Sequence, residues 1–265
     1  MFVEAALAAD ELGFESLWFP EHLVLPLSMA GSPFAGAEHP PVPPSTPVFD
    51  VFAYLGYLAG RTSRIRLGTH VYNLALRHPF TSARAIQTVD VVSGGRLEVG
   101  IGAGWLEAEW IAAGLDFASR GARLDEALDV CRRLWTEETI EHHGRFFDFG
   151  PVMFEPKPVQ SPHPPMIIGG KSPAALRRAA RNDGWIGLGH TPESVRVPVA
   201  TLTELRQSEG REGTPFLVVV GGTVADDTDV EAFAAAGVDR LIVSPWARTR
   251  DVSEGLVTFA RRFIG

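Results

Sequence analysis

The sequence predicts an α/β fold in which helices connect the strands of a parallel sheet. Short apolar runs rich in β-branched and aromatic residues recur along the chain. Between them lie segments whose apolar residues follow a helical period. Strands and helices that alternate in this way are typical of parallel sheets. The expected strands are 14–19, 65–72, 97–101, 166–168, 185–188, 216–220 and 240–243. The expected helices are 3–12, 50–59, 79–92, 124–135, 173–181, 193–208, 227–236 and 252–263.

Local signals define the individual elements. One helix begins at Pro79, which suits a first helical turn, and stops at Gly94. An apolar stripe at helical spacing runs through 124–135. The segment 140–165 has aromatic residues and prolines but no helical period, so we expect an excursion with a hairpin that turns at 143–144.

The number of strands favours a barrel. Each of the seven expected strands is followed by a helix, and a further helix precedes the first strand. A closed (β/α)8 or TIM barrel has eight strands, so we expect a barrel that lacks its first strand in this chain, as one domain over 1–265. An open doubly wound sheet is the alternative. It is disfavoured because no Gly-x-Gly-x-x-Gly turn follows the first strand.

Composition narrows the class of protein. The chain has 265 residues, 45% of them hydrophobic, and a net charge of −8, which disfavours a nucleic-acid partner. No apolar run approaches the roughly 20 residues that span a bilayer. One cysteine, Cys131, excludes a disulfide framework and fits a reducing compartment. We therefore expect a cytoplasmic protein that acts on a small molecule.

The strand ends carry the candidate chemistry, because active sites of such barrels lie there. Glu21 and His22 follow the first strand, and a carboxylate beside an imidazole can hold a polar ring and relay a proton. The alternative is a surface acid next to a capping histidine. After the third strand, the alternating glycines Gly100, Gly102 and Gly104 would let a flat ring or a phosphate approach the main chain.

A second group of candidates comes later in the chain. Gly169, Gly170, Lys171 and Ser172 join a strand to a helix, and free N–H groups with a cation would make an anion site. The alternative is a tight turn with Ser172 as a helix N-cap. His190 also follows a strand and could face a pocket.

Taken in order, these segments resemble the luciferase-like family of flavin- and F420-dependent oxidoreductases, and most closely its F420-dependent branch. The resemblance covers nearly the whole chain and is most specific between 13 and 185. The matching phrases are GFESLWFPEH at 13–22, RLGT at 66–69, RHP at 77–79, SGGRL at 93–97, GIGAGW at 100–105, PKPVQ at 156–160, PPMIIGG at 164–170 and DGW at 183–185.

The resemblance implies a barrel that binds an isoalloxazine-like ring at its C-terminal mouth. His22 would assist proton transfer and Glu21 would position it. A non-prolyl cis peptide at His70–Val71 would back the ring, and Asn73 would contact the cofactor. The residues implied to bind cofactor are Glu21, His22, His70, Val71, Asn73, Gly102, Ala103, Gly104, Gly169, Gly170, Lys171 and Ser172.

The substrate side is less defined. Trp105 stands where some F420 dehydrogenases carry a glutamate, so we place Trp105 and His190 in the substrate pocket and assign no role to Glu107 or Glu109. A proline-rich loop over 26–47 and the excursion would shape that pocket, because long loops in compact domains are often functional. No residue set has metal-ligand spacing. The family also implies a homodimer.

The expected function is hydride transfer between C5 of the deazaflavin coenzyme F420 and a small organic substrate. The nearest alternative keeps the fold and uses FMN to activate oxygen as a monooxygenase. A non-catalytic or incomplete cofactor-binding barrel is the second alternative, since the first strand is not in this chain. A sugar-phosphate isomerase or aldolase is the third, and the aldolase lacks a candidate Schiff-base lysine.

Overall fold

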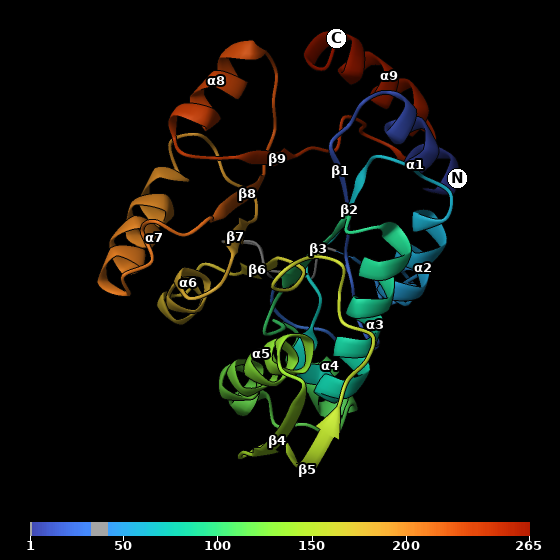
Figure 1. Ribbon diagram of the computed structural model, residues 1–265. Coiled ribbons are helices and arrows are strands. Elements are labelled where there is room, and N and C mark those ends of the chain that lie inside the picture. The colour runs from blue at the N-terminus through green and yellow to red at the C-terminus, as the bar shows by residue number, and fades with distance from the viewer. Residues whose placement is uncertain (1, 33–41) are drawn as a thin grey trace. The chain divides into compact units, whose positions relative to one another are not determined.

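The computed structural model describes residues 2–32 and 42–265 (Figure 1). Part of the proline-rich loop at 26–47 therefore lies outside the described residues. Within them the chain divides into two compact units, and each is described by itself. The first unit comprises Met1–Trp18, Tyr57–Gly68 and Pro165–Gly265, and the second comprises Phe19–Gly56 and Thr69–Pro164.

The first unit contains four parallel strands that lie side by side in chain order (Figure 1). The register pairs Ile168 with Trp185, and Trp185 with Val218. The buried apolar residues of the first three of these strands explain why short runs without alternation were recognisable as strands. The strands are β6 (Met166–Gly169), β7 (Gly184–Gly187), β8 (Leu217–Gly221) and β9 (Arg240–Ile242). The helices between and after them are α6 (Pro173–Ala180), α7 (Arg196–Ser208), α8 (Asp227–Ala235), the 3-10 turn η3 (Thr249–Asp251) and α9 (Val252–Phe263).

The chain begins with α1 (Phe2–Glu11), which packs against α9 in the same unit. Phe14, just after α1, stacks on Phe259 of α9 with ring centroids 5.9 Å apart. Asp10 accepts hydrogen bonds from the backbone N–H groups of Ser63, Arg64 and Ile65. Partial burial opposes ionisation of Asp10, but these N–H groups hold its pKa below the usual value. The carboxylate therefore fixes the turn that leads into the second strand.

Strands β1 (Ser16–Phe19) and β2 (Arg66–Thr69) each pass from the first unit into the second. In the second unit, the N–H of His70 donates to the carbonyl of Phe19 at 2.7 Å. The expected strand 65–72 is shorter than predicted: β2 ends at Thr69. The His70–Val71 peptide that follows is cis. Tyr72 rejoins the sheet as an isolated bridge to Ile101 of β3 (Leu97–Ile101). All seven expected strands are present in the described residues.

The second unit also holds the helices that follow these strands. Helix α3 (Pro79–Ser93) begins as expected at Pro79, with His78 as N-cap, and ends at Gly94 in the left-handed conformation. The apolar stripe of α5 (Arg120–Thr136) is buried, including Cys131. The short helix α4 (Glu107–Ala112) was not predicted, because six residues are too few to show a period. The remaining helices are α2 (Val51–Ala59), which reaches into the first unit, and the 3-10 turns η1 (Leu74–Leu76) and η2 (Phe117–Ser119).

The excursion between α5 and β6 forms the expected hairpin, of β4 (Thr139–His143) and β5 (Asp148–Met153). Glu126 of α5 accepts the backbone N–H groups of Arg145, Phe146 and Phe147 at the hairpin turn. No helix among the described residues is both long enough and apolar enough to cross a bilayer.

The return of the excursion depends on Asp90, a fully buried carboxylate of α3. Its oxygens accept hydrogen bonds from Val159 N at 2.7 Å, Gln160 N at 3.1 Å and Gln160 Nε2 at 2.7 Å. Because the carboxylate is fully buried and charged, its removal takes the strongest acceptor from all three donors. Asp90 therefore fixes the chain just before it enters β6.

We expect Asp90→Ala to lower the free energy of unfolding by about 3 kcal/mol, because three donors lose one acceptor. Asp90→Asn should cost less, because its amide oxygen still accepts. Urea denaturation of both variants measures the difference. Asp129→Ala, at an exposed position of α5, is the control and should stay within about 0.5 kcal/mol of the parent. A loss below about 1 kcal/mol for Asp90→Ala would contradict this role.

Candidate active site

The site is built around His22, three residues after β1 ends. Its Nδ1 lies 3.0 Å from Oε2 of Glu109 in α4. The Glu109 side chain is 0% exposed, and the His22 side chain is 17% exposed. Oε1 of Glu109 accepts the backbone N–H groups of Leu23 at 2.5 Å and Val24 at 3.3 Å. One buried carboxylate therefore holds both the imidazole and the chain that follows it.

Trp105 lies against the histidine, and its role in a substrate pocket stays a prediction. The two rings meet edge to face, with centroids 5.9 Å apart and an interplanar angle of 87°. Trp105 is only partly buried. The imidazole is therefore supported by a carboxylate at Nδ1 and by an indole at one edge.

Glu21 has a different partner from the one expected. Its Oε1 accepts a hydrogen bond from Arg77 Nη2 at 2.6 Å, and its Oε2 accepts the backbone N–H of Asn73 at 3.0 Å. The Arg77 guanidinium in turn lies over the ring of Tyr72, 4.7 Å from its centroid. The prediction that Glu21 positions His22 is therefore wrong. Glu21 instead fixes the segment that carries Asn73.

That segment begins with the cis peptide predicted at His70–Val71. Burial lowers the pKa of His70 to about 4, so the imidazole is neutral at pH 7. Asn73 is buried, and its Oδ1 lies beside Gly104. His70, Val71 and Asn73 thus lie in one short stretch at the end of β2.

The glycines after β3 were predicted to let a ring or a phosphate approach the main chain. At Gly102 the structure shows a different neighbour. A Cβ at Gly102 would lie 2.5 Å from Cγ2 of Val71, so the glycine lets the protein's own chain approach. Gly104 adopts φ 77°, which favours glycine, and a Cβ there would lie 2.7 Å from Nε1 of Trp110. That indole nitrogen is buried and has no hydrogen-bond partner among the described residues. Ala103 lies between the two glycines and is partly buried.

The Gly169–Ser172 turn belongs to the first unit. Ser172 Oγ accepts the N–H of Ala175 at 3.2 Å, so Ser172 caps α6, which was the alternative reading of this residue. Gly170 has φ 117°, and its carbonyl accepts Trp185 Nε1 at 2.8 Å. Gly169 ends β6, and Lys171 is exposed. Anion binding at this turn stays a prediction.

His190 lies in the same unit, after β7. Its Nδ1 lies 3.2 Å from Ser194 Oγ, and its ring meets the Trp185 ring at 5.5 Å. Burial, and then the nearby charge of Lys171, lower its pKa. The histidine is tied to its own loop, and its role in a substrate pocket stays a prediction.

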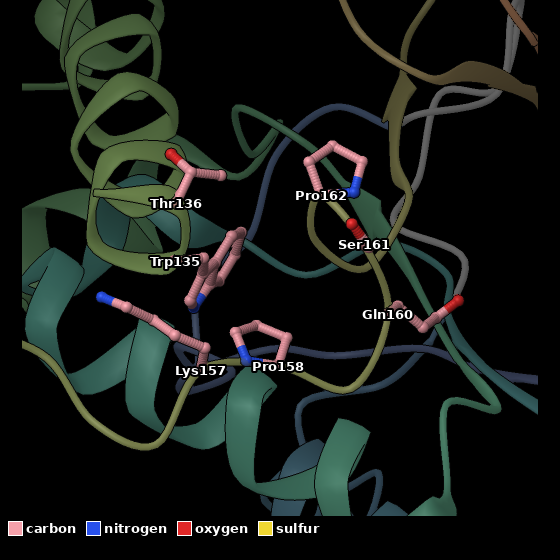
Figure 2. Close-up of a pocket in the computed structure, with 7 residues that line it drawn as sticks. All are labelled: Trp135, Thr136, Lys157, Pro158, Gln160, Ser161 and Pro162. Carbon is pink, nitrogen blue, oxygen red and sulfur yellow. The ribbon is translucent and has the colours of Figure 1, made fainter. Parts of the chain in front are cut away.

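A separate open pocket of about 300 Å³ lies beside the end of α5 (Figure 2). Its lysine, Lys157, donates to the carbonyls of Leu134 and Glu137 and so closes the helix end. The pocket contains none of the predicted site residues. The residues that line it are Trp135, Thr136, Lys157, Pro158, Gln160, Ser161 and Pro162. Among the described residues, no group of three or more His, Cys, Asp and Glu side chains could hold a metal ion.

Sequence reasoning missed Glu109, Arg77 and Trp110. Glu109 is 87 positions from His22, and Arg77 is 56 positions from Glu21. A pattern of neighbouring residues cannot reveal partners that are so far apart in the sequence. A weak signal was present in α4, where Glu109 lies at helical spacing from the buried Leu106 and beside the buried Trp110.

The depressed pKa of His70 predicts a pH-dependent stability. The folded state resists protonation, so the contribution of His70 is present above pH 6.5 and is lost as pH falls towards 4. We expect wild-type protein to lose about 2 kcal/mol between pH 7 and pH 5 that a His70→Asn variant does not lose. Urea denaturation at both pH values checks this, with the exposed His143→Asn as control. Equal pH slopes for His70→Asn and wild type would refute it.

Known proteins resemble this chain along most of its length. Residues 1–256 match the family described as luciferase-like monooxygenase. The Mycobacterium tuberculosis protein Rv0953c is 34% identical over 254 residues, which are 93% of this chain and 88% of that protein. The oxygenase component of flavin-dependent trigonelline monooxygenase from Acinetobacter baylyi is 30% identical over 182 residues, 68% of this chain and 45% of that protein.

Solved structures agree on the fold. The coenzyme F420 dependent tetrahydromethanopterin reductase from Methanopyrus kandleri aligns with a TM-score of 0.78 and 17% identity, over 99% of this chain and 94% of that chain. The expected barrel class is thereby confirmed. This chain belongs to the luciferase-like monooxygenase family.

Proposed function

We propose that the protein is an F420-dependent oxidoreductase that transfers a hydride between C5 of the deazaflavin and a small organic substrate. The observation that carries the proposal is the His22–Glu109 pair at the C-terminal end of β1. Active sites of this fold lie at such strand ends. Interconversion of an alcohol and a carbonyl moves a proton as well as a hydride, and an imidazole is suited to that proton.

The residues near His22 fit a flat, polar-edged cofactor. Gly104 has no side chain, and the Asn73 oxygen and the unpartnered Trp110 Nε1 lie beside it. An unpartnered buried N–H is costly unless it finds an acceptor. Asn73, Gly104 and the neutral His70 would hold the ring system. Phosphate binding by Gly169, Gly170, Lys171 and Ser172 is a separate prediction for the first unit. Bound F420 supplies a carbon that accepts or returns a hydride.

His22 would act on the proton. In oxidation, the substrate hydroxyl proton passes to Nε2 of His22 while the C–H bond breaks and its electron pair leaves with the hydride. In reduction, the same nitrogen returns the proton to the carbonyl oxygen. Trp105 would border the substrate and exclude water, since it lies at the edge of the imidazole.

An FMN-dependent monooxygenase is the second candidate. It is favoured by the 30% identity to a flavin-dependent monooxygenase over 68% of this chain. The matching sequence phrases favour F420 instead, because together, with the proline-rich loop after Glu21 and His22, they resemble the F420-dependent branch most closely.

The cofactor is tested by titrating the purified protein with F420 and, separately, with FMN while following cofactor fluorescence. We expect F420 to bind at least tenfold more tightly than FMN. Tighter binding of FMN, together with oxygen consumption by the reduced complex, would establish the second candidate. Binding of neither cofactor would refute both.

The role of His22 is tested by His22→Ala, with F420 absorbance followed against a panel of small alcohols and ketones. We expect kcat to fall by about 10² to 10⁴, while the Kd for F420 stays within threefold. His143→Ala is the matched control, because His143 is exposed on the β4–β5 hairpin and also pairs with a carboxylate. Full turnover by His22→Ala would show that another group moves the proton.

A further inference from the structure

We propose that Glu109 is the positioning residue of this site: it holds the proton of His22 on Nδ1 and leaves Nε2 as the nitrogen that faces substrate. This inference rests on the proposed function for its catalytic consequence, but the tautomer is a property of the protein alone. Glu109 does not touch the reacting atoms in this account. It acts through His22.

The first step is the chemistry of the carboxylate. Glu109 is fully buried and receives three donors, namely His22 Nδ1 and the N–H groups of Leu23 and Val24. A carboxylate is an acceptor only, so the imidazole nitrogen that faces it carries the proton. In the neutral ring the other nitrogen is then an acceptor. Nε2 is therefore ready to take a proton.

The second step is rigidity. Leu23 and Val24 come directly after His22, so their two bonds to Oε1 fix the main chain next to the imidazole. On the other side, Trp110 follows Glu109 and is fully buried, between Gly104 and the ring of Phe117 at 6.4 Å. Neither end of the His22–Glu109 bond can move without breaking other contacts. The geometry is set before substrate binds, which favours catalysis.

The third step is charge. When Nε2 takes a proton, the imidazolium lies 3.0 Å from an ionised carboxylate that is shielded from water. An ion pair in such surroundings is stronger than one at the surface. Glu21 cannot substitute, because both its oxygens are engaged by Arg77 and Asn73. The carboxylate that stabilises charged His22 is therefore Glu109.

The kinetic test is Glu109→Gln in the F420-loaded enzyme. The amide keeps the shape and can still accept from Nδ1, but it cannot pair with an imidazolium. We expect kcat to fall by about 10- to 1000-fold, with KM and the Kd for F420 within threefold of wild type. Glu107→Gln is the control, because Glu107 is an exposed carboxylate in the same helix and should keep wild-type kcat. A kcat within threefold of wild type for Glu109→Gln would overturn the proposal.

The second measurement needs neither turnover nor a stable Glu109 variant. Nitrogen-15 NMR of the unliganded wild-type protein reports which ring nitrogen of each histidine is protonated, and His22→Gln identifies the signal of His22. We expect a proton on Nδ1 and none on Nε2 at neutral pH. A proton on Nε2 would overturn the proposal. If wild type binds no F420 but shows the Nδ1 tautomer, the cofactor assignment fails while the positioning role stands.

Discussion

The buried carboxylate of Glu109 is the contact on which the candidate site depends. It costs free energy to bury an ionised group, and the cost is offset only where donors surround it. Here the donors are an imidazole and two consecutive backbone N–H groups, so the same interaction that makes the burial tolerable also determines the path of the chain after β1. The orientation of His22 and the local path of the chain therefore depend on the same carboxylate.

Carboxylates hold irregular segments elsewhere in the chain as well. Glu21 holds the turn at Asn73, and Asp10 holds the turn that leads into β2. Glu126 does the same at the turn of the β4–β5 hairpin, and Asp90 does so at the return of the excursion. Each of these acids lies on or beside a helix or strand. Its carboxylate accepts N–H groups from an irregular segment. These four segments are therefore held by carboxylates that accept backbone N–H groups.

Regular elements were predictable because burial imposes a period on the sequence. The stripe on α5 and the apolar run of β3 are examples, and β3 and α9 were predicted with the right bounds. His22 and Trp105 were both singled out because each follows a strand, and the structure brings their rings together. Family resemblance, rather than any local pattern, supplied the cis peptide at His70–Val71.

The failures have equally physical causes. Glu21 and His22 are adjacent in sequence, yet each side chain binds a different partner. The partners that they do have, Arg77 and Glu109, lie far along the chain. Helix α4 carries Glu109 and is too short for periodicity to reveal. At Gly102 a small residue was read as space for a ligand, whereas the side chain of Val71 occupies it.

The excursion is attached to the helices at its hairpin turn and at its return, and this decides which substitutions it tolerates. Glu126 binds its hairpin turn and Asp90 binds its return, so both anchors lie on helices of the scaffold and the acceptors contact mainly backbone atoms. Backbone N–H groups are common to nearly all residues, so a substitution at an exposed position of this segment leaves both anchors intact. Exposed side chains of the segment can therefore change without loss of either anchor, whereas Phe147 and Phe154 are buried and constrained by packing.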